Sequence, residues 1–276
     1  MNFIKLGWME MKKLFLQREI YIALFLCTVF FAMGVFSIGD AVTPIAFWRE
    51  LASVIPYIGF WFIAVLIVVG IARCLPFERE QKMDELLLTY GKGFLTLLII
   101  KQFTIFIYCA VIVLYFYIIA FFGLAMKYDI AGLFSRIELD PPFLFDANPN
   151  WTFAKLLIYE YGYTVLASYI FALFTLLLSL FIKRSVFIMM VAGGIFALGE
   201  LYEKFIESFI GTMELSEYIG AIYDYGFNGM LSYQYLDTFS PFSKTEIYIL
   251  FLFVALLLFA LNLLIGRRRK NAWMGD

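Results

Sequence analysis

The chain has 276 residues, of which 63% are hydrophobic and 20% are aromatic, and its mean hydropathy is +0.88. A soluble domain with this composition would expose too much apolar surface. Several apolar runs near or above ~18 residues instead predict an all-α, polytopic membrane protein. The formal net charge is −1. This charge says nothing about nucleic acid, but the lack of a basic patch with interleaved aromatic residues argues against nucleic-acid binding.

Few residues are available for metal or nucleotide chemistry. The chain has no histidine, and its three cysteines, Cys27, Cys74 and Cys109, are scattered in or beside apolar stretches, where we interpret them as packing residues. No phosphate-binding G-x-x-x-x-G-K-[ST] motif and no G-x-S-x-G motif occurs in the sequence. We therefore expect no enzyme activity, no metal site and no cofactor bound by this chain.

The N-terminal residues 1–19 alternate between apolar and charged side chains. This pattern predicts an amphipathic helix on the membrane surface rather than a cleaved signal peptide, although a simple topogenic flank would look similar. The first span is predicted at Ile20–Ile38. A short polar connection that contains Arg49 and Glu50 leads to the second span at Val54–Ala72.

The segment 73–94, between the second and third spans, is densely charged. It contains Pro76, then a run of acidic and basic side chains, then three leucines, and it meets a glycine at Gly91. This order predicts a short amphipathic helix that a glycine ends. Such a helix is well placed to transmit a movement of a soluble partner to the spans. The alternative is an ordinary interfacial helix.

The third apolar segment, Leu95–Met126, is longer than a ~30 Å hydrocarbon core requires, so it must tilt, protrude or break. Residues 127–160 form the first sizeable polar interval, and the fourth span is predicted at Tyr161–Ile182. A tight turn at Lys183–Arg184 precedes the fifth segment.

Glycines and glutamates distinguish the fifth segment, which starts at Ser185. Gly193–Gly194 would permit a close helix contact or a bend. Glu200, Glu203 and Glu207 share one helix face by their spacing. They are candidates for a substrate path, an outer gate, a cation site or a proton relay; the alternative is a solvated acidic face beyond the hydrocarbon.

The distribution of lysine and arginine predicts the orientation. After a sixth span at Glu246–Ile265, the basic cluster Arg267–Lys270 lies on the same side as the basic N-terminal residues and the segment 73–94. Because cytoplasmic loops carry the excess of basic residues, both termini and this segment are predicted to be cytoplasmic. The chain is then one transmembrane domain, 1–276, with extracytoplasmic segments at 127–160 and 200–245.

The residues from Phe77 to Lys101 resemble the coupling segment of ABC transporter type-2 permeases. They follow the order F-x-R-E, a charged helix, E-L-L, a glycine break and a basic residue at the next span. Many family members have a proline where this chain has Tyr90–Gly91. By this resemblance, the residues that contact the ATPase are Phe77, Glu78, Arg79, Glu80, Asp84, Glu85, Leu86 and Leu87.

The resemblance implies a multi-pass permease subunit of the cell membrane that exports a peptide, drug or lipid-like molecule. Its partners would be the lipid bilayer, an ABC ATPase that holds ATP and Mg, and a second permease copy or a related permease. A secondary transporter or a non-transporting scaffold is the first alternative, although no matched inverted repeats are evident. A membrane-embedded enzyme that uses the glutamates is a weaker alternative, since the chain lacks histidine.

Overall fold

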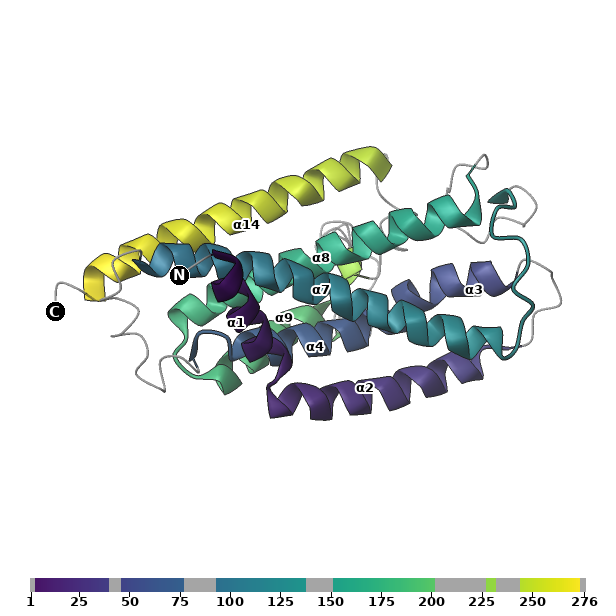
Figure 1. Ribbon diagram of the computed structural model, residues 1–276, viewed down its shortest axis with the longest axis horizontal. Coiled ribbons are helices and arrows are strands. Elements are labelled where there is room, and N and C mark those ends of the chain that lie inside the picture. Colours follow the sequence, from purple (N-terminus) through teal and green to yellow (C-terminus); the bar gives the residue numbers. More distant parts are fainter. Residues whose placement is uncertain are drawn as a thin grey trace, which may run out of the picture.

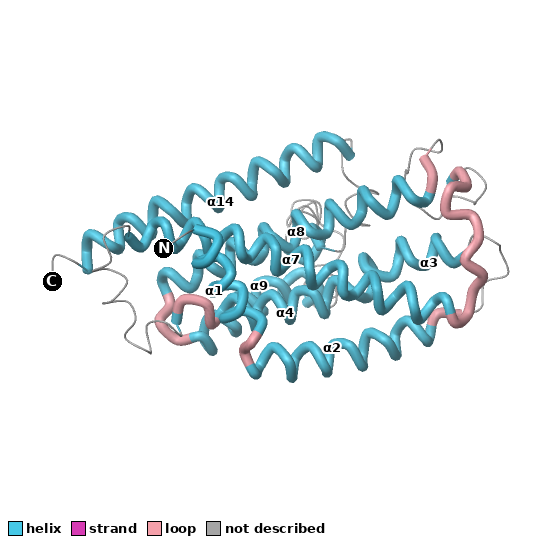
Figure 2. Tube along the Cα trace, in the orientation of Figure 1, coloured by secondary structure: helices cyan, strands magenta, loops and turns pink. Residues whose placement is uncertain are grey.

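A computed structural model describes residues 3–39, 46–76, 93–137, 151–201, 227–231 and 244–273. Within these ranges every regular element is a helix (Figure 2). Five of the described helical segments are long and apolar enough to cross a membrane. The protein is therefore an all-helical, multi-pass membrane protein.

The predicted N-terminal amphipathic helix is present as α1 (Phe3–Phe15), which lies across the other helices at one end of the bundle (Figure 1). It is shorter than predicted. Leu16 and Gln17 form a link, and the next helix, α2 (Arg18–Ser37), already includes Arg18 and Glu19. The first candidate span therefore begins close to the predicted position.

The second candidate span, Ala46–Ala72, starts earlier than predicted. It comprises α3 (Ala46–Val54), a π-helical turn η1 (Ile55–Gly59) and α4 (Phe60–Ala72). The prediction that Arg49 and Glu50 lie in a polar connection is wrong, because both belong to α3 and form an ion pair of 3.4 Å. The opposite face of α3 is apolar and buried, and its packing keeps the chain helical through Arg49 and Glu50.

The third span is one unbroken helix, α7 (Gly93–Ala125), of 33 residues. At ~1.5 Å per residue it is about 50 Å long, well above a ~30 Å hydrocarbon core. The excess length predicted from the sequence is thus taken up by a helix that tilts or protrudes and does not break.

The fourth span, α8 (Phe153–Phe181), begins well before the predicted Tyr161. Thr152 caps its N-terminus by accepting a hydrogen bond from the Lys155 backbone N–H at 3.4 Å. Glu160 therefore belongs to α8. The predicted turn at Lys183–Arg184 is confirmed, because the next helix starts at Ser185.

The last described helices are α9 (Ser185–Leu201), α12 (Phe227–Leu231) and α14 (Lys244–Trp273). The apolar part of α9, Ser185–Leu198, is too short to count among the five candidate spans. The close helix contact that Gly193–Gly194 would permit is not made among the described residues, because a Cβ on either glycine would meet nothing within 4 Å.

The centre of the bundle is α8, which packs against α4, α7 and α14. Its most apolar window is 72% buried, whereas the corresponding windows of α2 and α14 are only 22% buried. These two outer helices therefore present most of their apolar surface to lipid, while α4 and α8 form the core.

One end of the bundle brings together α1, the start of α2, the ends of α4 and α8, the starts of α7 and α9, and the end of α14 (Figure 1). Most basic residues with described side chains lie on these segments: Lys5, Lys12, Lys13, Arg18, Arg73, Lys101, Lys183, Arg184, Arg267 and Arg268. We call this the basic end.

Candidate functional site

The predicted ATPase-contacting residues lie outside the described residues. They are Phe77, Glu78, Arg79, Glu80, Asp84, Glu85, Leu86 and Leu87. Glu203 and Glu207 are also outside, and for Glu200 only the backbone, in α9, is described. The structure does describe both flanks of the segment, up to Pro76 and again from Gly93. The candidate site is built on these flanks.

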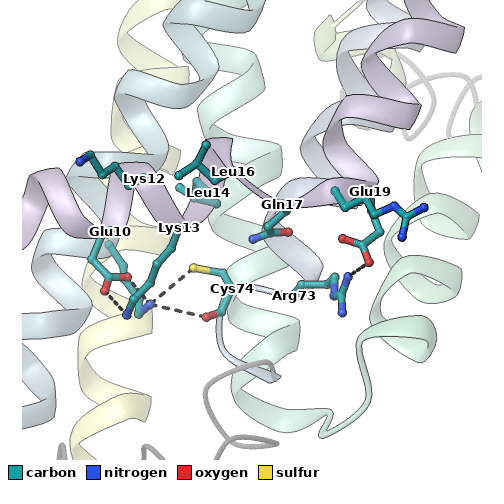
Figure 3. A pocket seen from close by; sticks show the side chains of 11 residues that line it. Glu10, Lys12, Lys13, Leu14, Leu16, Gln17, Glu19, Arg73 and Cys74 are labelled. Carbon is teal, nitrogen blue, oxygen red and sulfur yellow. Dashed lines mark hydrogen bonds and ion pairs between the residues drawn. The ribbon is translucent and has the colours of Figure 1, made fainter.

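A buried ion pair joins α1 to α7. The Lys101 Nζ donates to Glu10 Oε2 at 2.5 Å, and Lys13 Nζ donates to Glu10 Oε1 at 2.7 Å (Figure 3). The exposed fractions of Lys101 and Glu10 are only 1% and 2%. Because each buried charge would otherwise be costly to desolvate, this geometry holds α1 against the start of α7.

The same lysine also reaches the end of α4. Its Nζ lies 3.5 Å from the Cys74 carbonyl oxygen and 3.7 Å from the Cys74 Sγ. Both are weaker contacts than the ion pair. Lys101 was predicted only as the basic residue that opens the third span; it in fact lies inside α7 and connects three elements.

A second ion pair lies beside the first. The Arg73 guanidinium, at the end of α4, pairs with the Glu19 carboxylate in the first turn of α2 (Figure 3). The Glu19 side chain is half exposed, so this pair stabilises less than the buried one does. Consequently, Arg73, which opens the predicted coupling segment, contacts α2, and Cys74 contacts Lys101, the partner of Glu10 on α1.

The Glu10 carboxylate is ionised at neutral pH. Burial by itself would raise its pKa, but the ammonium groups of Lys101 and Lys13 outweigh this and hold the pKa below the usual 4.5. The contact between α1 and α7 is therefore a charged pair, and a neutral carboxylic acid would weaken it.

Between the two ion pairs lies a cleft of about 460 Å³ (Figure 3). Its wall is formed by the second half of α1, the link to α2, the first turn of α2, the end of α4 and Lys101. Its lining side chains are Glu10, Lys12, Lys13, Leu14, Leu16, Gln17, Arg18, Glu19, Arg73, Cys74 and Lys101. Of the charged side chains that line the cleft, five are basic and two are acidic.

A separate polar cluster lies towards the opposite end of α8. Glu160 is 4% exposed and lies close enough to the Tyr117 hydroxyl on α7 to interact with it electrostatically. Thr164 is also near this hydroxyl. The Tyr161 hydroxyl donates to the Ala110 carbonyl of α7 at 3.1 Å. Glu160 was not among the predicted site residues because the fourth span was predicted to begin at Tyr161; the capping residue Thr152 is the signal in the sequence for the earlier start.

No known protein-family model matches the chain, and no curated protein matches it significantly.

Proposed function

We propose that this protein is the transmembrane permease subunit of an ATP-driven exporter, in which the segment 73–94 receives the motion of a separate ATPase. The observation that supports the proposal is the set of contacts that Lys101 makes at the basic end. The side chain of Lys101, on α7 after the segment, contacts Cys74 at the start of the segment and Glu10 on α1. A force on the segment would act on all three elements together.

The mechanism uses α4 and α7 as levers. Both helices start or end at the segment and run towards the other end of the bundle (Figure 1). The buried Glu10–Lys101 pair makes α1 move with α7, and the Arg73–Glu19 pair makes α2 follow α4. Closure of two ATPase subunits would thereby move α4 and α7 together with α1 and α2, which is the kind of rigid-body change that opens a path.

The proposed topology has six crossings. The chain enters α9 at the basic end, where α8 finishes, and enters α14 at the opposite end (Figure 1). A fifth crossing that begins with α9 would join these two points. With the basic end in the cytoplasm, both termini are cytoplasmic, in accord with the excess of lysine and arginine there. The substrate class in this proposal is a peptide, a drug or a lipid-like molecule.

The test is co-purification of the tagged chain from its native membrane in mild detergent. A co-purifying ATPase is expected with the unaltered chain and is expected to be lost, or to hydrolyse ATP without transport, in the triple variant Glu80→Ala, Asp84→Ala, Glu85→Ala. The matched control removes three carboxylates from the predicted outer interval: Glu214→Ala, Glu217→Ala and Asp224→Ala. If no nucleotide-binding partner appears, or both triple variants lose it equally, the proposal fails.

One observation favours a second candidate, an ion-coupled secondary transporter. Glu160 is a buried carboxyl group within a candidate span, and such groups commonly bind coupling ions or protons. In this case transport by the purified chain in vesicles would follow an ion gradient without ATP. Glu160→Gln would abolish that transport, while the triple variant of the coupling segment would leave it intact.

A further inference from the structure

The cleft at the basic end carries more positive than negative charge. Its lining includes five cationic side chains and two carboxylates, an excess of three positive charges. Glu10 is already matched by Lys13 and Lys101, and Glu19 by Arg73 with Arg18 nearby. The remaining positive charge lies on the exposed side chains of Lys12 and Arg18, and it would attract an anion.

Exposed apolar side chains surround this cleft, as expected at a membrane boundary. On α1, Trp8 and Met9 are 57% and 43% exposed, and Leu16 beside the cleft is 66% exposed. An amphipathic helix with exposed tryptophan and lysine is typical of the lipid headgroup region. One turn beyond Arg18, α2 begins an exposed apolar face with Ile22 and Phe25. A ligand in the cleft would therefore lie at the level where the phosphate groups of the bilayer meet its acyl chains.

We propose that this cleft binds the phosphate group of an anionic phospholipid, with the acyl chains along the outer face of α2. The cleft volume of about 460 Å³ lies in the range of small-molecule sites. Basic pockets beside membrane-spanning helices suit such headgroups. A free phosphate ion would satisfy only the charges, whereas a phospholipid also covers Leu16 and the start of α2. The proposal is independent of the ATPase.

The test is native mass spectrometry of the full chain in detergent, titrated with phosphatidylglycerol or phosphatidylcholine. Retention of phosphatidylglycerol is expected to be the stronger. Arg18→Gln is expected to weaken it about fivefold, the effect of one cation near a lipid headgroup. The matched control is Arg136→Gln, an exposed arginine at the opposite end of the bundle, which is expected to leave retention unchanged.

Three results would overturn the proposal. One is equal retention of the two lipids, and another is an equal loss with both arginine variants. The third is complete displacement of phosphatidylglycerol by inorganic phosphate, which would indicate a free-anion site. If Arg18→Gln lowers the melting temperature, Arg18→Lys replaces it. This variant keeps the positive charge and is expected to retain phosphatidylglycerol within about twofold. Lysine binds phosphate as a point charge, although it lacks the bidentate geometry of arginine.

Discussion

The Glu10 carboxylate on α1 and the Lys101 ammonium on α7 form a buried ion pair of 2.5 Å, although 91 residues separate them in the sequence. This contact makes α1 part of the helix bundle, whereas an amphipathic helix held only by its apolar face would be free to slide on the membrane. The position of α1 beside the end of α4 and the start of α7, which flank the segment 73–94, is therefore a fixed feature of the fold.

Glu10→Gln should destabilise the protein strongly. The substitution removes the carboxylate partner of a lysine that is 1% exposed, and a buried charge that loses its partner costs about 3–5 kcal/mol. The melting temperature in detergent, followed by tryptophan fluorescence, measures the effect.

Lys13→Gln is the control for that measurement. The Lys13 side chain is 41% exposed, so its contact with Glu10 should contribute less than about 1 kcal/mol. The double variant Glu10→Leu, Lys101→Met removes both buried charges and should recover much of the lost stability. Equal destabilisation by Lys13→Gln and Glu10→Gln would contradict the assignment of the buried pair.

Acidic pH should release α1 from α7. The pKa of Glu10 is lower in the folded protein than its usual 4.5, so ionised Glu10 contributes stability in full above about pH 4.5. That contribution is lost as the pH falls through the lowered folded value, because protonation removes the charge that faces Lys101. Hydrogen exchange of the α1 amides, corrected for the intrinsic effect of pH, should show a loss of protection in this acidic window.

The pH effect should be absent in Glu10→Gln, which has no titrating group at this position. A similar loss of α1 protection in this variant over the same pH window would assign the transition to another carboxyl group.

Much of the fold could be predicted from the sequence, because apolar length and periodicity alone define membrane helices. The positions of α2, α7 and α14 follow from these signals. The errors arose where helices continue through polar residues. Arg49 and Glu50 were assigned to a connection because they are charged, yet their neighbours bury an apolar face.

The candidate site could be predicted only in part. The charge pattern indicated that the segment 73–94 is important, but it did not predict the contact between the flanks of this segment and α1. No sequence signal pairs Glu10 with Lys101, since the contact depends on how α1 crosses the bundle. Glu160 was overlooked for a different reason. The pattern of three clustered glutamates drew attention to Glu200, whereas a single glutamate near a helix start has no periodic signature.

Gly70→Ala should destabilise the core. A Cβ at this position would lie 2.8 Å from the Cζ atom and 3.2 Å from the Cε1 atom of Tyr108. Tyr108 is fully buried and its hydroxyl donates to the Leu66 carbonyl at 2.8 Å, so the ring cannot move away without breaking that bond. Overpacking of this kind costs about 1–3 kcal/mol.

Gly194→Ala provides the matched comparison within another helix. A Cβ there meets no atom within 4 Å, so the change should be neutral, or stabilising by up to about 1 kcal/mol through helix propensity. Unfolding of both variants in the same detergent tests the difference. A loss of stability in Gly194→Ala comparable to that of Gly70→Ala would indicate a contact to this face that a single chain does not make.

Asn262→Leu should loosen the attachment of α14 to the core. Asn262 is fully buried on an otherwise lipid-facing helix, and its Nδ2 donates to the Leu173 carbonyl of α8 at 3.1 Å. Leucine has a similar size but cannot donate, and hydrogen bonds between membrane helices contribute about 0.6 kcal/mol on average and at most about 1.7. The expected loss of stability lies in this range, measured by unfolding in detergent.

The control for Asn262→Leu is Leu264→Ala on the same helix. Leu264 is 59% exposed, so truncation there removes contacts with detergent or lipid and should change stability by less than about 0.5 kcal/mol. If Asn262→Leu is instead neutral or stabilising, the bond to Leu173 does not hold α14, and apolar packing against α8 alone determines its position. In that case the Tyr163–Phe251 ring contact, with centroids 5.0 Å apart, is the next interaction between α8 and α14 to remove.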